Sequence, residues 1–158
     1  MDARGGAKYF TTLDLASSYW QIPVANKDKA KTAFVTPFGL FQFRVMPFGL
    51  CNAPSTFQRL MNHILQGLPF VRVYLDDIIV FSGSPEEHAR HVQLVFERLR
   101  KAGLHLKLSK CVFGRTELEF LGHAVSAAGV RPLINKVAAL RERPAPKNAA
   151  DVRTFLGI

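Results

Sequence analysis

The chain has 158 residues, of which 48% are hydrophobic and 21% are charged. This composition is that of one globular domain, or a piece of one, and excludes a disordered segment. The longest stretch without a charged residue, residues 45–58, is too short and too rich in proline for a membrane-spanning helix, which excludes an integral membrane protein. Asp2, Arg4 and Lys8 interrupt the amino-terminal residues, so we expect no secretory signal.

Positive charge is in excess, since 21 Lys and Arg against 12 Asp and Glu give a formal net charge of +9. Nucleic acid is therefore the first partner to consider, although many basic domains bind none. Cys51 and Cys111 stand alone, without a CxxC pair. They favour a reduced intracellular protein with buried thiols, and one disulfide is the alternative.

Hydrophobic periodicity predicts an order of elements that separates hairpins from helices. The predicted strands are residues 8–15, 31–36, 40–45, two within 70–81, 104–108 and 118–125, and the predicted helical segments are 16–21, 54–65 and 84–102. Ser84, Pro85 and Glu87 are typical of a helix start, and Gly103 is placed to end that helix. This order predicts an α+β fold, with an antiparallel sheet and helices packed on one of its faces.

Two adjacent carboxylates, Asp76 and Asp77, interrupt the apolar segment FVRVYLDDIIVF of residues 70–81. Two ionised carboxylates side by side in apolar surroundings cost free energy, because burial and like charge both disfavour ionisation. A divalent cation would relieve both effects. The alternative is a solvated turn, since aspartate is common in turns, but an Ile-Ile-Val run directly afterwards is not typical of tight turns.

Asp14 is a third carboxylate, at the end of another apolar strand-like segment. Two strands that end side by side would bring Asp14, Asp76 and Asp77 together. Such clusters hold the paired metal ions of phosphoryl transfer, and Mg²⁺ suits them because it prefers carboxylate and phosphate oxygens. Together with the basic charge, the pattern suggests chemistry on nucleotides.

Longer motifs accompany these carboxylates. They are TLDLASSYWQI at residues 12–22, FRVMPFGLCNAP at 43–54, YLDD at 74–77, LSKC at 108–111, FLGH at 120–123 and RTFLG at 153–157. In this order and spacing they resemble the reverse transcriptase of gypsy-like LTR retrotransposons over nearly the whole chain. The resemblance implies the palm and part of the fingers of an RNA-directed and DNA-directed DNA polymerase, working by two-metal nucleotidyl transfer from a dNTP to a primer 3′-hydroxyl.

The resemblance also implies a role for each carboxylate. Asp14 and Asp76 correspond to the metal-bridging aspartates of the palm, and Asp77 corresponds to the third acidic residue. The main-chain carbonyl of Leu15 would complete the shell of two Mg²⁺ ions, for which Mn²⁺ can substitute. Lys110 corresponds to the lysine proposed to protonate the pyrophosphate leaving group, and Lys107, three residues earlier, is the alternative.

A nucleotide pocket is implied by two of the motifs. Its residues are Ala16, Ser17, Ser18, Tyr19, Phe48 and Gly49. Tyr19 matches the aromatic residue that excludes a 2′-hydroxyl in the family, and a core aromatic is the alternative. Gly49 lets backbone come close to a ligand, which a side chain would obstruct.

Contacts with primer and template are implied at three places. The residues are Tyr74, Pro54 and Gln58 at the start of a helix, and the hairpin of Phe120, Leu121, Gly122 and His123. Tyr74 shares a strand face with Arg72, so we expect it on the nucleic-acid side. Gly122 permits a sharp bend and His123 can donate to a phosphate, although a structural histidine is the alternative.

Read with the resemblance, residues 1–140 are a palm with partial fingers, and residues 141–158 are a linker followed by the start of the thumb or connection region. The upstream fingers strands, RNase H and integrase of such polyproteins are not recognisable in this sequence, so we expect the remainder of the polyprotein as a partner, with template, primer and dNTP. The family suggests a cytoplasmic particle and then the nucleus.

Other functions stay open at this point. The chain could be a catalytically silent retroelement-derived fragment that only binds nucleic acid, or an interaction module without a nucleic-acid role. The intact carboxylates favour an active polymerase over the silent fragment. His88 and His91 lie three residues apart, as metal ligands can, but without a third ligand we interpret them as a solvated helix face.

Overall fold

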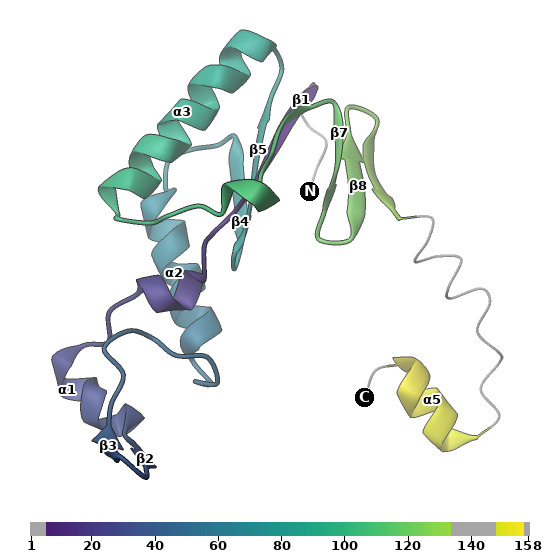
Figure 1. Cartoon of the computed structure of the whole chain (residues 1–158). Coiled ribbons are helices and arrows are strands. Elements are labelled where there is room, and N and C mark those ends of the chain that lie inside the picture. The colour runs from purple at the N-terminus through teal and green to yellow at the C-terminus, as the bar shows by residue number, and fades with distance from the viewer. Residues whose placement is uncertain (1–5, 134–147, 157–158) are drawn as a thin grey trace.

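The computed structural model describes residues 6–133 and 148–156. Figure 1 shows the path of the chain. The strands are β1 (Tyr9–Asp14), β2 (Phe34–Thr36), β3 (Gly39–Phe41), β4 (Val71–Tyr74), β5 (Asp77–Ser82), β6 (Val112–Arg115), β7 (Glu117–Phe120), β8 (His123–Ser126) and β9 (Gly129–Pro132). The helices are α1 (Asn26–Lys29), α2 (Ala53–Ile64), α3 (Pro85–Lys101) and α5 (Ala149–Leu156), with 3-10 turns η1 (Ser18–Gln21), η2 (Ala30–Thr32) and η3 (Leu108–Lys110).

Antiparallel pairing organises the described strands into three sheets. The largest has the order β4-β5-β1-β6, so β1 lies between β5 and β6. The register pairs Tyr9 with Ser82 at one end and Asp14 with Asp77 at the other. The last residue of β1 and the first residue of β5 are therefore direct neighbours, as the sequence predicted for its carboxylates.

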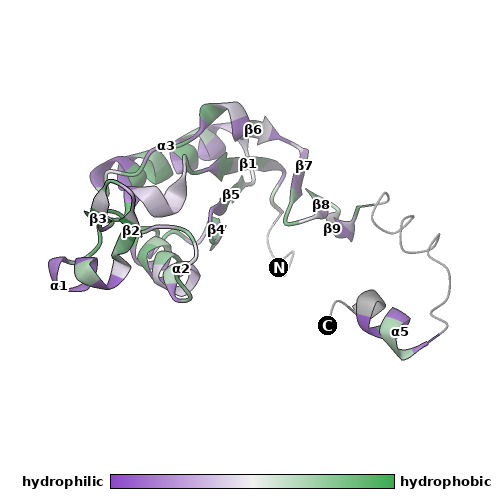
Figure 2. Cartoon of the chain, turned by 60° about the horizontal axis from the view of Figure 1, so that its bottom comes forward, coloured by the Kyte–Doolittle hydropathy of each residue, from purple (hydrophilic) through white to green (hydrophobic). Residues whose placement is uncertain are grey.

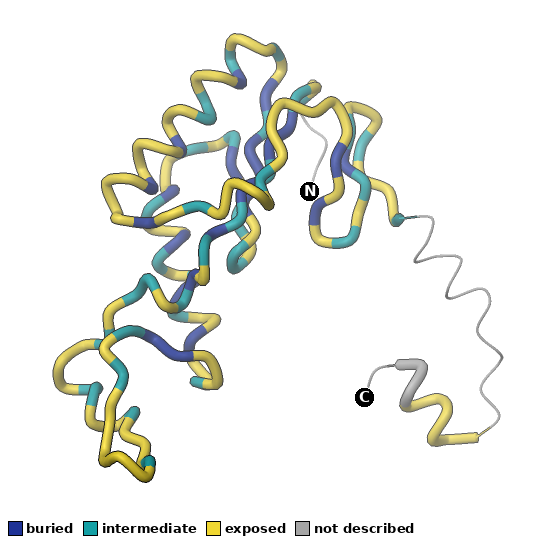
Figure 3. The backbone as a smooth tube through the Cα atoms, in the orientation of Figure 1, coloured by how far each residue is buried: buried dark blue, intermediate teal, exposed yellow. Residues whose placement is uncertain are grey.

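Side chains of this sheet alternate between its two faces. On one face Leu13, Ile78 and Val80 belong to a core with residues of α2 and α3, namely Phe57, Met61, Val95 and Leu99. On the other face Phe10 and Ile79 pack against the β7–β8 hairpin. Figures 1 and 3 show α2 and α3 beside one face and the buried strands between the layers. The predicted α+β fold with helices on one face is confirmed.

Residues 104–108 do not form the predicted strand. Leu106 makes only an isolated bridge with Leu15, and the chain then enters η3. The pairing stops because β6 is the strand that continues along β1, between Phe10 and Thr12. The predicted strand at 31–36 is also shorter than expected, since its first residues belong to η2.

Helix α3 begins and ends where the sequence predicts. Ser84 accepts a hydrogen bond from the amide of Glu87 at 3.2 Å, and the Glu87 carboxylate in turn accepts one from the amide of Gly83 at 2.8 Å. Gly103 follows the helix with a φ of +71°, a conformation that glycine adopts readily. Figure 2 shows hydrophobic and hydrophilic residues on different sides of α3, in keeping with its buried Val95 and Leu99.

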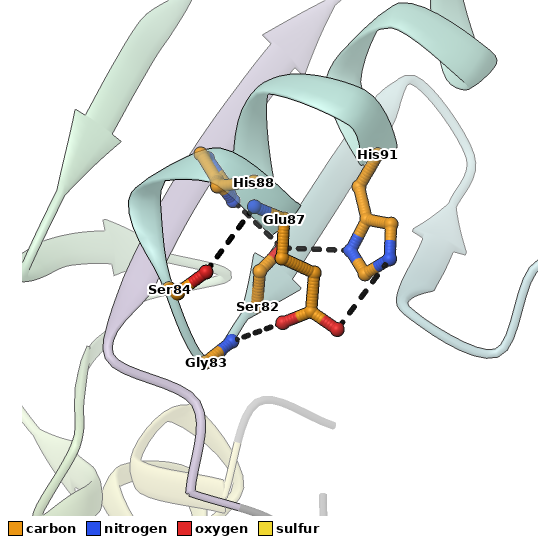
Figure 4. Close-up of polar contacts among 6 residues, drawn as sticks. All are labelled: Ser82, Gly83, Ser84, Glu87, His88 and His91. Carbon is orange, nitrogen blue, oxygen red and sulfur yellow. Dashed lines mark hydrogen bonds and ion pairs between the residues drawn. The ribbon is translucent and has the colours of Figure 1, made fainter.

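His88 corrects the prediction of a solvated face. It is buried, with Nε2 at 2.7 Å from the Thr11 hydroxyl and Nδ1 at 2.9 Å from the Ser82 hydroxyl. The same Ser82 oxygen also bonds Nδ1 of His91, a contact drawn in Figure 4, and their separation is 2.8 Å. The His91 ring stacks on Phe70. The apolar periodicity of a helix cannot predict this burial, because it depends on hydroxyl groups that β1 and β5 supply.

Three further expectations concern the thiols, a membrane-spanning helix and the domain boundary. Cys51 is exposed and Cys111 is half-buried, so the expected burial of both thiols is wrong for Cys51. No helix within residues 6–133 and 148–156 has the length and hydropathy needed to cross a bilayer. The expected domain boundary at residue 140 lies outside the described residues.

Candidate active site

The three carboxylates gather where β1 ends and the β4–β5 hairpin turns. Tyr74 pairs with Asp77, so Leu75 and Asp76 form a two-residue turn between the strands. Leu75 has a φ of +50°, in the left-handed region that residues with side chains seldom occupy. The turn thereby holds Asp76 beside the Asp14–Asp77 pair of the β1–β5 ladder.

A cavity of about 570 Å³ opens at this edge of the sheet. Its lining residues are Asp14, Leu15, Ala16, Ser17, Ser18, Phe48, Asp76, Leu106, Lys107 and Lys110. Five of them belong to the motif at residues 12–22, and Phe48 belongs to the motif at 43–54. The fold thus brings six predicted site residues from two motifs around one cavity, together with Asp76 and Lys110. Leu106 escaped the sequence analysis, because a single leucine in an apolar segment carries no signal of a site.

Negative charge is not fully compensated in this cavity. Among the described residues, Asp76 Oδ1 is buried and has no hydrogen-bond partner. Asp77 is not among the lining residues, although it pairs with Asp14 in the ladder. Loss of solvent raises the pKa of its carboxyl, and the charges of Asp14 and Asp76 raise it further, against a lowering effect of Lys110. An unpartnered carboxylate oxygen beside like charges fits a bound cation.

No three Asp, Glu, His or Cys side chains in residues 6–133 and 148–156 are close enough to hold a metal ion by themselves. The donor set is therefore incomplete without other oxygens, such as the Leu15 carbonyl or a ligand's phosphates. That arrangement suits Mg²⁺, which is usually bound through one or two carboxylates together with substrate phosphates.

Lys110 forms an ion pair with this cluster. Its Nζ lies 3.2 Å from Asp14 Oδ2, across 96 residues of sequence. The backbone of Lys107 donates to the Asp14 carbonyl at 2.9 Å, and the amide of Ala16 donates to the His105 carbonyl at 3.0 Å. These bonds fix the 105–110 segment beside the end of β1, so both candidate lysines line the cavity.

Two of the predicted nucleotide-pocket residues, Tyr19 and Phe48, belong to an aromatic group. The Tyr19 ring lies 5.3 Å from Phe48 and 5.5 Å from Phe57, between centroids. Burial raises the pKa of the Tyr19 phenol, with a smaller contribution from Asp76. Ser18 Oγ is buried and without a hydrogen-bond partner in the described part of the chain. Phe48 lines the cavity and is 61% exposed, whereas Tyr19 and Gly49 are not among the lining residues.

The predicted contacts with primer and template differ in their surroundings. Tyr74 is 57% exposed and Pro54 is also exposed, as a surface contact requires. Gln58 instead turns toward the β4–β5 turn, where it bonds the backbone of Val73 and Leu75.

The FLGH hairpin joins β7 to β8 in a sheet separate from that of the carboxylates. Leu121 and Gly122 both have positive φ, of +49° and +74°, which makes the turn tight. Phe120 is buried, while His123 is exposed and bonds the carbonyl of Leu121 at 2.9 Å. None of these residues is among those that line the cavity.

Comparison with solved structures agrees with this architecture. A foamy viral protease-reverse transcriptase solved in complex with double-stranded DNA aligns with a TM-score of 0.87 and 26% identity, over 97% of this chain and 27% of that chain. A second foamy viral protease-reverse transcriptase, in complex with an RNA/DNA hybrid, gives a TM-score of 0.81 and 27% identity, over 95% of this chain and 20% of that one.

Sequence comparison gives the family. The chain is 47% identical over 156 residues to a retrovirus-related Pol polyprotein from transposon 297 of Drosophila melanogaster and 40% identical over 156 residues to that from transposon gypsy. It is 38% identical over 154 residues to the transposon Tf2-3 polyprotein of Schizosaccharomyces pombe. The matches cover 96–98% of this chain but only 12–15% of these relatives. Residues 1–125 match the family model of reverse transcriptase (RNA-dependent DNA polymerase), and the chain belongs to this family.

Proposed function

We propose that this chain is the catalytic portion of an RNA-directed and DNA-directed DNA polymerase. The observation that carries the proposal is the cavity in which Asp14 and Asp76 lie together, with Asp76 Oδ1 buried and unpartnered among the described residues. Family membership supplies the reaction class, and the cavity supplies a place for it.

Asp14 and Asp76 would hold two Mg²⁺ ions, with Asp77 and the Leu15 carbonyl as further oxygen donors. Bound ions of this kind lower the barrier of an in-line displacement by neutralising the attacking and leaving oxygens. Lys110, an exposed cation at the mouth of the site, would hold a proton within reach of the pyrophosphate leaving group. In this arrangement the ion pair orients the side chains of Asp14 and Lys110.

The partners that fit the site are a dNTP and a template with its primer. Phe48 offers an exposed ring at the cavity for a sugar or base, and Tyr19 packs behind it. The net charge of +9 supports binding to a polyanion. The two solved relatives described above were in complex with double-stranded DNA and with an RNA/DNA hybrid. The rest of a longer polyprotein is a further proposed partner, since the chain spans about 15% of its relatives' length.

Extension of a labelled primer on homopolymeric RNA and DNA templates tests this function, with Mg²⁺ or Mn²⁺ and the purified chain. We expect incorporation by the wild-type chain and its loss in Asp76→Asn, which keeps the size of the side chain and removes its charge. The matched control is Asp151→Asn, an exposed aspartate on α5. Incorporation that persists in Asp76→Asn would reject the proposed site. A folded wild-type chain that incorporates nothing would reject activity of this portion alone.

A further inference from the structure

The hydrogen bonds of Gln58 connect helix α2 to the turn that carries Asp76. Gln58 Oε1 accepts from the amide of Leu75 at 2.7 Å, and its Nε2 donates to the carbonyl of Val73 at 3.2 Å. Both polar ends of one side chain are therefore bonded to backbone on either side of Tyr74. This use of the amide leaves little capacity for a primer or template contact.

Strand β4 makes this pairing necessary, because it is the outermost strand of the order β4-β5-β1-β6. An edge strand has backbone donors and acceptors that no other strand satisfies. Gln58 makes the pair of bonds that a residue of a further strand would make with the residues flanking Tyr74. The edge of the sheet is thus capped by one side chain, next to the turn.

Leu75 needs such support because of its backbone conformation. Its φ of +50° is seldom adopted by a residue with a side chain, and such conformations persist where surrounding contacts hold them. Asp76 follows directly, so the direction of its carboxylate depends on the Leu75 backbone. Asn62 Oδ1, at 2.9 Å from Gln58 Nε2, orients the amide from the same helix. Phe57, beside Gln58, is fully buried and anchors that helix in the core.

We propose that Gln58 is a positioning residue, whose amide fixes the Leu75–Asp76 turn and thereby aims the Asp76 carboxylate at the metal site. This inference rests on the proposed function, since it takes Asp76 to bind the metal. Gln58 itself touches no reacting atom in this account. Its effect passes through the backbone of Leu75.

The test replaces Gln58 with methionine, which keeps the length of the side chain and removes its hydrogen bonds to Val73, Leu75 and Asn62. Gln93→Met is the matched control, because exposed Gln93 on α3 also bonds a side chain four residues later, Glu97, at 2.9 Å. Amide exchange followed by NMR without metal should accelerate on the order of tenfold at Leu75 in Gln58→Met alone. The dissociation constant for Mn²⁺ should rise on the order of tenfold in the same variant.

A second variant guards against misfolding of the first. Asn62→Ala removes only the group that orients the amide from an exposed position, and it should shift Leu75 exchange and Mn²⁺ affinity in the same direction by a smaller factor. Leu75 exchange that is unchanged in both variants would overturn the inference. If Asp76→Asn abolishes Mn²⁺ binding but Gln58→Met and Asn62→Ala leave it unchanged, the positioning role of Gln58 is overturned and the proposed function stands. A wild-type chain that binds no Mn²⁺ would reject the proposed function and this inference with it.

Discussion

Asp77 lies opposite Asp14 in the β1–β5 ladder, and this juxtaposition has a consequence for stability. The pKa of Asp77 is raised by loss of solvent and then by Asp14 and Asp76. A raised pKa in the folded state means that the folded chain binds this proton more tightly than the unfolded chain does. Stability is therefore lost as the pH rises from the ordinary aspartate value of 3.8 through the raised value.

From this sign we expect Asp77→Asn to be more stable than the wild-type chain at neutral pH without metal. The difference should shrink as the pH falls toward 3.8, because the wild-type carboxyl is then protonated as well. Urea unfolding curves of both chains across this range measure it, with Asp28, whose pKa is lowered by its hydrogen bond to Lys31, as a contrasting site. A wild-type chain that is the more stable of the two at neutral pH would contradict a raised pKa of Asp77.

Lys110 and Lys107 can be separated by their contacts. Only Lys110 makes an ion pair with Asp14, at 3.2 Å, while Lys107 offers its backbone. Because Lys110 is exposed, Lys110→Gln should change the free energy of unfolding by less than about 1 kcal/mol. It should slow nucleotide incorporation by about a hundredfold, in the range of a lost general acid, and Lys107→Gln should slow it far less. The reverse ranking in single-turnover rates would assign the role to Lys107.

At the scale of elements, the junction between α3 and the sheet depends on buried polar contacts. His88 bridges the hydroxyls of Thr11 and Ser82, which belong to β1 and β5. Replacing it with alanine would remove both bonds and leave a void in the interior, while Ser82 keeps His91 and Thr11 keeps the amide of Gly114 as partners. We expect a loss of about 2–4 kcal/mol. Arg90→Ala, exposed on the same helix, should cost less than about 0.5 kcal/mol. Equal effects in chemical denaturation would show that the network does not hold the helix.

The same histidine makes stability depend on pH in the acid range. Burial lowers the pKa of His88, with a further lowering by His91. A lowered pKa in the folded state means that the unfolded chain takes up the proton first, so stability is complete above the ordinary value of 6.5 and falls as the pH drops below it. His88→Gln should weaken this dependence between about pH 6.5 and pH 5 in urea titrations. An unchanged slope would show that another group titrates there.

Elements with a long periodic pattern could be predicted from the sequence. Helices α2 and α3 were predicted, because buried apolar residues recur on one face of each: Phe57 and Met61 on α2, and Val95 and Leu99 on α3. Strands β6 and β9 could not, because each is only four residues long and lies where no apolar alternation stands out. These strands are held by pairing with a neighbouring strand, β1 for β6 and β8 for β9, which the local sequence does not reveal.

The candidate site was predictable to a different degree. Asp14, Asp76 and Asp77 stood out as charges in apolar surroundings, a signal that needs no structure. The hydrogen-bond partners of Gln58 could not be predicted, because a glutamine on a helix carries no information about which backbone groups it contacts. His88 was misassigned for the same reason, since hydroxyls 6 and 77 residues away decide its burial.

For the whole molecule, the excess of positive charge predicts how it meets nucleic acid. If phosphate contacts drive binding, the logarithm of the affinity for a primer–template duplex should fall linearly with the logarithm of salt concentration. Six such contacts would weaken binding by about a thousandfold between 50 and 200 mM salt. Fluorescence anisotropy measures this dependence. Absence of binding at low salt would favour an interaction module without a nucleic-acid role.

In the function proposed here, the end of β1 and the Leu75–Asp76 turn form one metal-dependent site. Mapping Mn²⁺ by paramagnetic broadening of assigned backbone amides tests it most directly, because it does not require the rest of a polymerase. We expect the earliest broadening at Asp14, Leu15, Asp76 and Asp77, and its disappearance in Asp76→Asn. Broadening centred on Glu86 and Glu87 in the first turn of α3, or unchanged by Asp76→Asn, would contradict the account.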